Sequence, residues 1–164
     1  GPFMKMILQH TKAKRLQDAL RSKLFHRQLT ASSRREVVHE LTAAMCESTG
    51  LDLNLVETAV WSREEAMPTG IGNGIALPHA RVPGLKEPMV AVGISEAGID
   101  FDAPDGKRAN IIFLALTPEE LPSAQLELGA EIARRFRRFE TTEQVLRTKN
   151  YAEFLAIIKN PESS

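Results

Sequence analysis

The sequence predicts a single α/β domain in which a mixed β-sheet of about four or five strands is flanked by helices. Runs with apolar residues at the helical period alternate along the chain with short runs rich in valine and isoleucine. The chain has 164 residues, of which 43% are hydrophobic and 26% charged. These values fit one domain with a sizeable core.

The first confident helix is predicted to begin after Ser33. Ser33 and Glu36 have the S-x-x-E spacing of a capping box, in which two first-turn amides are satisfied reciprocally. Apolar residues then recur at the helical period until Gly50, which is a typical stop signal. A second, shorter helix is expected to follow, from Asp52 towards residues 61–65.

Proline and glycine residues then interrupt the helical pattern, and short β-strands are predicted. The first covers residues 75–77 and is closed by Pro78 and His79, which places His79 at a strand end. Turn signals and apolar runs predict further strands at residues 89–95, 99–101 and 110–116.

Helices return in the C-terminal third. Ser123 is expected to cap a helix whose broad apolar face contains Leu126, Leu128, Ala130, Ile132, Ala133 and Phe136. Thr141 and Gln144 have a second capping-box spacing, and the apolar residues after them predict one or two short terminal helices.

Charge sets the start of the chain apart from the rest. Between Met4 and Arg27, seven lysines and arginines face a single aspartate. We expect residues 4–23 to be a basic arm or linker. It is either a solvated helix or frayed arm, or a segment drawn to anionic lipid in a longer, membrane-tethered protein. Residues 1–3 are expected to be a remnant of tag removal, and residues 160–164 a frayed tail.

Composition and motif content disfavour several classes of function. Twenty-one Lys and Arg balance 21 Asp and Glu, so the net charge is zero and nucleic-acid binding is not expected. The chain lacks CxxC, HExxH and GxxxxGK[ST], so no metal or cofactor is expected. The three aspartates at residues 100–105 fit turn formation better than cation binding.

The lone Cys46 is expected to be a buried, unreactive thiol, which fits a reducing compartment. No run approaches the roughly 18 apolar residues of a membrane-spanning helix, and no signal peptide opens the chain. A cytoplasmic location is therefore expected, including that of a cytoplasmic domain of a membrane protein.

His79 is the candidate reactive residue. Gly70, Gly72 and Gly74, with Asn73 between them, precede it in the string TGIGNGIALPH over residues 69–79. A neutral imidazole can accept a phosphoryl group near neutral pH, and that anionic group needs backbone amides and cations beside it. The glycine-rich loop could supply the amides, and Arg63 and Arg81 the cations.

These residues resemble the enzyme IIA domains of the fructose/mannitol and nitrogen-regulatory type in the bacterial sugar phosphotransferase system. The resemblance rests on residues 62–65 (SREE), 69–79 and 98–106 (GIDFDAPDG), and it spans residues 24–159. It implies that His79 takes a phosphoryl group from the phosphocarrier HPr. His79 then passes the group to a sugar-transport component or keeps it as a regulatory mark. It also implies that Arg63 helps to hold the group.

Gln125 departs from the family pattern. Members usually carry a second active-site histidine in an H-L-x-L-L-A string, and the matching string here is QLELGA over residues 125–130. Gln125 can still donate a hydrogen bond to a phosphoryl oxygen or to His79, but it cannot titrate. Ala80, directly after His79, stands where glycine is commoner and restricts the backbone.

Three functions therefore stay open. The first is phosphotransfer through His79. The second is a regulatory domain without relay activity, attached to a membrane transporter, that senses a nucleotide or another anionic metabolite. The third is a partner-binding protein controlled by phosphorylation. A docking partner requires His79 in a shallow surface depression, whereas a small-molecule sensor could place it deeper.

Overall fold

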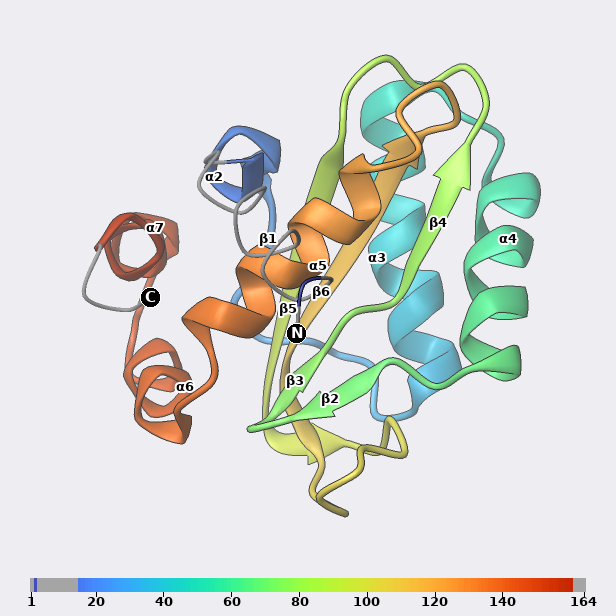
Figure 1. Cartoon of the computed structure of the whole chain (residues 1–164). Helices are drawn as coiled ribbons and strands as arrows, with labels where there is room; N and C mark the ends of the chain where they lie inside the picture. Colours follow the sequence, from blue (N-terminus) through green and yellow to red (C-terminus); the bar gives the residue numbers. More distant parts are fainter. Residues whose placement is uncertain (1, 3–14, 161–164) are drawn as a thin grey trace.

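A β-sheet lies between two groups of helices in the computed structural model, which describes residue 2 and residues 15–160 (Figure 1). In chain order the elements are α2 (Arg15–Ala19), β1 (Leu20–His26), α3 (Arg34–Thr49), α4 (Leu53–Ala66), β2 (Gly70–Gly72), β3 (Ile75–Ala76), β4 (His79–Val82), β5 (Met89–Ile99), β6 (Ala109–Pro118), α5 (Ala124–Arg135), α6 (Phe139–Leu146) and α7 (Tyr151–Lys159). Helices α3 and α4 cover one face of the sheet, and α5 covers the other.

The six strands follow the order β1-β5-β6-β3-β2, with β4 pairing with β6 alone. Strands β5 and β6 are antiparallel, whereas β1 runs parallel to β5, and β3 and β4 run parallel to β6. The predicted mixed α/β architecture is confirmed, with one strand more than the upper estimate. The separate strand predicted at residues 99–101 is wrong, because β5 continues as far as Ile99.

Strands β3 and β4 are two parts of one line along the edge of β6. Ile75 pairs with Ile111, Ala76 with Ile112, and His79 with Ala115, so the register is the same before and after Leu77 and Pro78. Because side chains alternate along a strand, Leu77 and His79 share the face of the sheet that α5 covers. Ala76 and Ala80 contribute instead to the core on the α3–α4 face.

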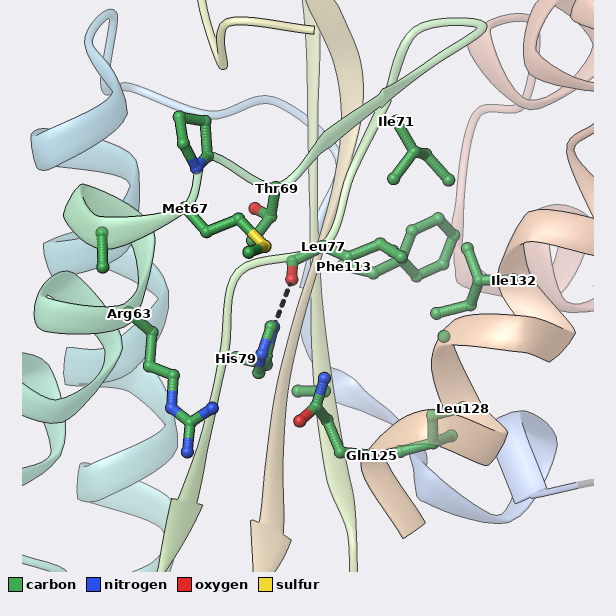
Figure 2. A pocket seen from close by; sticks show the side chains of 14 residues that line it. Arg63, Met67, Thr69, Ile71, Leu77, His79, Phe113, Gln125, Leu128 and Ile132 are labelled. Carbon is green, nitrogen blue, oxygen red and sulfur yellow. Dashed lines mark hydrogen bonds between the residues drawn. The ribbon is translucent and has the colours of Figure 1, made fainter. Parts of the chain in front are cut away.

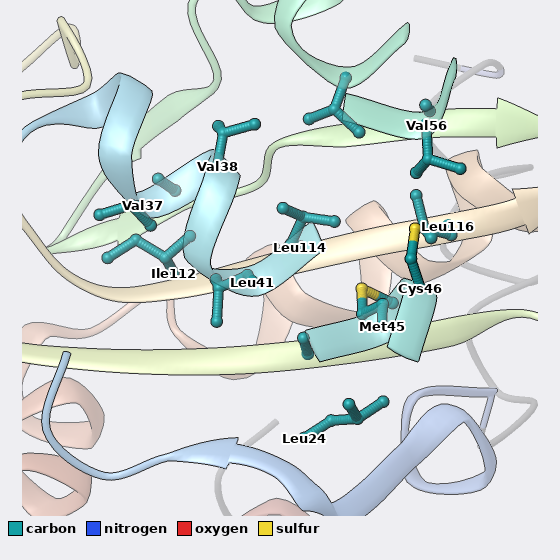
Figure 3. Packing of buried hydrophobic residues seen from close by; sticks show 14 of the residues in the cluster. Leu24, Val37, Val38, Leu41, Met45, Cys46, Val56, Ile112, Leu114 and Leu116 are labelled. Atoms are coloured by element: carbon teal, nitrogen blue, oxygen red, sulfur yellow. The ribbon is translucent and has the colours of Figure 1, made fainter. Parts of the chain in front are cut away.

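Two hydrophobic cores lie on the two faces of the sheet. On the first, Leu41, Met45 and Cys46 of α3 pack over Ile112 and Leu114 of β6 (Figure 3). On the second, members of α5 and α7 pack against β6 around Phe113. Cys46 is buried as predicted, and burial raises the pKa of its thiol. The central strands are therefore apolar on both sides, as expected for a doubly covered sheet.

The predicted starts of the first two long helices and the stop at Gly50 are confirmed. The Ser33 side chain accepts a hydrogen bond from the Glu36 amide, and Gly50 ends α3 with a left-handed φ of 77°. Asp52 caps α4 in the same way by accepting from the Leu55 amide. These contacts join residues three or four positions apart, which explains why sequence spacing reveals them.

The C-terminal helices differ in detail from the prediction. Helix α5 begins after Ser123, but the Ser123 side chain makes no capping hydrogen bond. Leu126 is 50% exposed, so its predicted place on the apolar face is wrong, whereas Leu128 and Ile132 are buried. The capping box at residues 141–144 is also wrong, because α6 already begins at Phe139.

The boundary predicted at residue 24 differs from the structure. Residues 15–23, assigned above to a basic arm, form α2 and the first part of β1, and Leu16 is fully buried. The Leu16 amide donates to Glu131 Oε1 at 3.0 Å, and Arg135 forms a 3.6 Å ion pair with Glu131. Residues 3–14 and 161–164, which include the rest of the predicted arm and most of the predicted tail, lie outside the described residues.

Helix α5 is also joined to the other end of the described chain. Arg135 donates to the carbonyl oxygen of Asn160 at 3.3 Å, and Arg15 of α2 forms an ion pair with Glu127. Within residues 15–160, no helix is both long enough and apolar enough to cross a membrane.

Candidate functional site

His79 lies half-buried in a pocket of about 450 Å³ at the edge of the sheet (Figure 2). Because β4 pairs with β6 alone, the end of α4 and the start of α5 both approach this edge, from opposite faces of the sheet. Phe113 of β6, which is fully buried, contributes to the pocket wall. The pocket is therefore deeper than a shallow surface depression, while His79 itself stays partly exposed.

The Leu77 carbonyl sets the tautomer of His79. The Nδ1 atom of His79 lies 2.9 Å from the Leu77 carbonyl oxygen. A carbonyl oxygen only accepts hydrogen bonds, so Nδ1 must carry the proton and donate it. In the neutral ring Nε2 then keeps its lone pair, which makes Nε2 the nucleophilic atom.

The surroundings favour the neutral form of His79. Burial lowers the pKa of the imidazole below its ordinary value of 6.5, and the nearby positive charge of Arg63 lowers it further. The hydrogen bond to Leu77 and the negative charge of Glu64 act in the opposite direction without reversing the shift. At neutral pH the ring is therefore an uncharged nucleophile.

The structure brings Arg63 and Gln125 to His79, as the sequence predicts. Figure 2 shows the Arg63 guanidinium and the Gln125 carboxamide on either side of the His79 ring. Arg63 belongs to the last turn of α4, and Gln125 is the second residue of α5. Among the described residues Arg63 has no hydrogen-bond or ion-pair partner for its side chain, so its charge is available to a ligand.

Glu64 shapes the wall beside Arg63. Its fully buried carboxylate accepts hydrogen bonds from the amide and the hydroxyl of Thr69, and it lies 3.5 Å from an Arg34 nitrogen. These contacts fix the connection between α4 and β2, which forms one side of the pocket. Glu64 was not among the predicted site residues, although its spacing of four residues from Val60 indicates the buried face of α4.

Gly70, Gly72, Asn73 and Gly74 do not line the His79 pocket, although Ile71 between them does. The Asn73 amide donates to Asp105, and its side chain donates to the carbonyl oxygens of Phe136 and Arg137. A Cβ atom on Gly74 would lie 2.8 Å from Asn110 Oδ1, so glycine permits a close approach between the β2–β3 turn and β6. Gly70 lies beside Phe101, and Gly72 beside Asp105.

Arg81 also lies apart from the pocket. It is exposed, two residues beyond His79 on β4, and lines a smaller recess beside the start of α4. Asp105 accepts hydrogen bonds from the amides of Asn73 and Lys107, which fits the predicted turn role. Across residues 15–160, no group of three His, Cys, Asp or Glu side chains is arranged to hold a metal ion.

The chain matches a known protein family over most of its length. Residues 18–161 match the family described as "Phosphoenolpyruvate-dependent sugar phosphotransferase system, EIIA 2". The chain belongs to this EIIA 2 family. The match also begins ahead of residue 24, in agreement with the structural role of α2 and β1.

Relatives of this EIIA 2 chain include regulatory proteins and sugar-transport proteins. It is 40% identical over 94 residues to a nitrogen regulatory protein from Pseudomonas aeruginosa, which covers 57% of this chain and 60% of that protein. It is 28% identical over 131 residues to the fructose-specific EIIABC component of Bacillus subtilis. That match covers 79% of this chain but 21% of the much longer relative.

Solved structures share the fold. The nitrogen regulatory protein IIA-Ntr from Neisseria meningitidis superposes with a TM-score of 0.82 at 26% identity, covering 88% of this chain and 99% of that one. A complex of mannitol enzyme IIA with phosphorylated enzyme IIB from Escherichia coli gives a TM-score of 0.68 at 13% identity. The match covers 85% of this chain and 97% of that one. The family match confirms the predicted family, and the structural likenesses confirm the predicted fold.

Proposed function

We propose that Nε2 of His79 accepts a phosphoryl group from an HPr-like phosphocarrier and passes it to a sugar-transport component or keeps it as a regulatory mark. The hydrogen bond from Nδ1 to the Leu77 carbonyl carries this proposal, because it leaves Nε2 as the nucleophile. The lowered pKa of the imidazole supports it further, since an uncharged ring is present at neutral pH.

The transfer step needs no external acid or base when both donor and acceptor are imidazole rings. The Nε2 lone pair forms the new N–P bond while the bond from phosphorus to the donor breaks, and the donor keeps the bonding electron pair. Nδ1 of His79 keeps its proton, so the ring gains positive charge. That charge strengthens the hydrogen bond to the Leu77 carbonyl.

Arg63 and Gln125 are the groups that would hold the phosphoryl oxygens. Arg63 supplies a positive charge without a competing partner in residues 15–160, and Gln125 supplies a neutral donor from the opposite side. Met67, Ile71 and Leu126 are exposed apolar side chains on the elements around the pocket. Such a surface suits a protein partner, and the mannitol IIA of Escherichia coli is seen with its phosphorylated IIB.

Phosphate transfer from phosphorylated HPr, followed by intact mass and acid lability of the product, tests the proposal. The wild-type chain should gain one phosphoryl group that His79→Ala loses. Arg63→Gln should slow the transfer more than Arg81→Gln, which removes the same charge outside the pocket. Transfer to His79→Ala at the wild-type rate would overturn the proposal.

Gln125 favours a second candidate, a regulatory domain of a transporter that has given up relay and senses an anionic metabolite. Glutamine cannot become cationic beside the phosphoryl group as the family's second histidine can. Under this alternative, the wild-type chain gains no phosphate, but Gln125→His does. Transfer to both chains would refute it. A tether to a membrane transporter on the cytoplasmic side belongs to this candidate.

A further inference from the structure

The pocket beside His79 extends well beyond what a phosphoryl group requires. Leu77 and Phe113 of the sheet face Leu128 and Ile132 of α5 across it (Figure 2). Most of the lining side chains are apolar, and the polar side chains of Arg63, His79 and Gln125 lie together at one end. A concave apolar space with a few convergent polar groups is the usual form of a small-molecule site.

Gly129 keeps this space open. It lies inside α5 with an ordinary helical backbone, and a Cβ atom there would meet only Leu77 Cδ1, at 3.9 Å. Neither backbone strain nor crowding therefore requires glycine at this position. Glycine weakens a helix interior relative to alanine, so its effect here is to leave volume between α5 and β3. A larger side chain on α5 would fill that volume.

The charge at the polar end selects the ligand. No acidic side chain lines the pocket. The nearby carboxylate of Glu64 contacts its partners Thr69 and Arg34 instead. Arg63 is a single positive charge without an ion-pair partner in the described part of the chain, and Gln125 can add a neutral donor. A nucleotide carries several phosphate charges and a polar sugar, which this lining does not match. One negative charge on an apolar body matches it.

We infer that this pocket binds an amphipathic monocarboxylate, with its carboxylate between Arg63 and Gln125 and its apolar chain between α5 and β6. A pocket of about 450 Å³ lies within the usual range for small-molecule sites and holds a chain of about eight carbon atoms. The carboxylate would occupy the place of the phosphoryl group. This consequence rests on the proposed function: a chain with the acid bound cannot be phosphorylated on His79, and a phosphorylated chain cannot bind the acid.

Octanoate, titrated into the unphosphorylated protein by calorimetry, tests the binding. Octan-1-ol and octylammonium have the same apolar chain without the negative charge. Octanoate should bind more tightly than octan-1-ol, and octylammonium should not bind, because Arg63 repels its cation. Equal binding of all three compounds, or no binding of octanoate at millimolar concentration, would overturn the inference.

Two leucine variants of α5 separate the pocket from the rest of the helix. Gly129→Leu fills the space beside Leu77 and should weaken octanoate binding by about tenfold or more. Ala133→Leu adds the same side chain at an exposed position of the same helix and should leave the affinity unchanged. Circular dichroism shows whether each variant is folded. Arg63→Gln should weaken binding by about tenfold, because a charged hydrogen bond is lost.

A second readout covers the case in which Gly129→Leu does not fold. Nuclear Overhauser effects between the octanoate methylenes and the methyl groups of Leu128 and Ile132 should appear in the wild-type protein. Contacts elsewhere on the surface would overturn the inference.

Phosphotransfer measured separately distinguishes the two proposals. If octanoate binds but His79 accepts no phosphate, the pocket inference stands and the proposed function fails. If His79 accepts phosphate and octanoate neither binds nor slows the transfer, the proposed function stands and the pocket inference fails. If both stand, octanoate should slow the transfer and octan-1-ol should not.

Discussion

Replacement of Asn73 should destabilise the fold. Asn73 joins the β2–β3 hairpin to the end of α5, because its side-chain amide donates to Phe136 O at 3.0 Å and to Arg137 O at 2.8 Å. Its φ is 54°, in the left-handed region. Asn73→Ala removes both hydrogen bonds, each worth about 0.5–1.5 kcal/mol. It also places a residue without local side-chain hydrogen bonding in a conformation that costs about 1 kcal/mol.

The alanine variant should therefore lose about 2–4 kcal/mol of unfolding free energy. Asn73→Gly is the matched control. The glycine variant loses the same hydrogen bonds but adopts a positive φ freely. Its free energy of unfolding should therefore be about 1 kcal/mol higher than that of the alanine variant. Urea denaturation at constant pH, followed by circular dichroism, measures both differences. A phosphate-binding role for Asn73 predicts instead that alanine lowers phosphotransfer at unchanged stability, and that result would refute the reasoning.

Three further predictions concern the pocket and the sheet. Burial lowers the pKa of His79 below 6.5, so the unfolded chain binds a proton at this residue more readily than the folded chain does. The free energy of unfolding should therefore rise with pH up to about 6.5 and then stay constant. His79→Gln should flatten this part of a plot of the free energy of unfolding against pH. Gly129→Ala should stabilise the protein by about 0.5–1 kcal/mol in urea denaturation, because alanine favours a helix interior and has room there. Gly93→Ala should destabilise the protein by about 1–3 kcal/mol, because its Cβ would lie 2.6 Å from the side chain of Leu29. Thr69→Val leaves the buried carboxylate of Glu64 with one donor fewer and should lower the melting temperature, at a cost of about 1–3 kcal/mol; an unchanged melting temperature would contradict the role given to this contact.

Sequence reasoning succeeded where the deciding contacts are local. Ser33 and Gly50 indicate the ends of α3 because each makes a hydrogen bond within one turn of the same helix. It failed at residues 141–144, because Thr141 fits a capping pattern but lies inside α6. The hydroxyl of the next residue, Thr142, donates to the carbonyl oxygen of Asn73, a residue 69 positions away. No local spacing reveals such a bond.

The site residues show the same difference between what the sequence reveals and what only the folded contacts reveal. His79, Arg63 and Gln125 were predicted and share one pocket, since the family resemblance carries their spatial relation. The glycine string was predicted as a phosphate cradle from its composition, but Asn73 is directed to the end of α5 by contacts that arise only on folding. Residues 15–23 were assigned to an arm on their charge. Leu16, Ala19 and Leu20 have the spacing of an apolar helical face, and all three are buried, although Leu20 already belongs to β1.

The position of α5 has a mechanical consequence. One face of this helix lines the pocket through Gln125 and Gly129, while Glu131 and Arg135 connect it to Leu16 and to Asn160, near the two ends of the described chain. These contacts therefore couple both ends of residues 15–160 to α5. In a longer polypeptide such as the fructose-specific relative of Bacillus subtilis, a neighbouring domain that pulls on either connection would change the width of the pocket without contacting it.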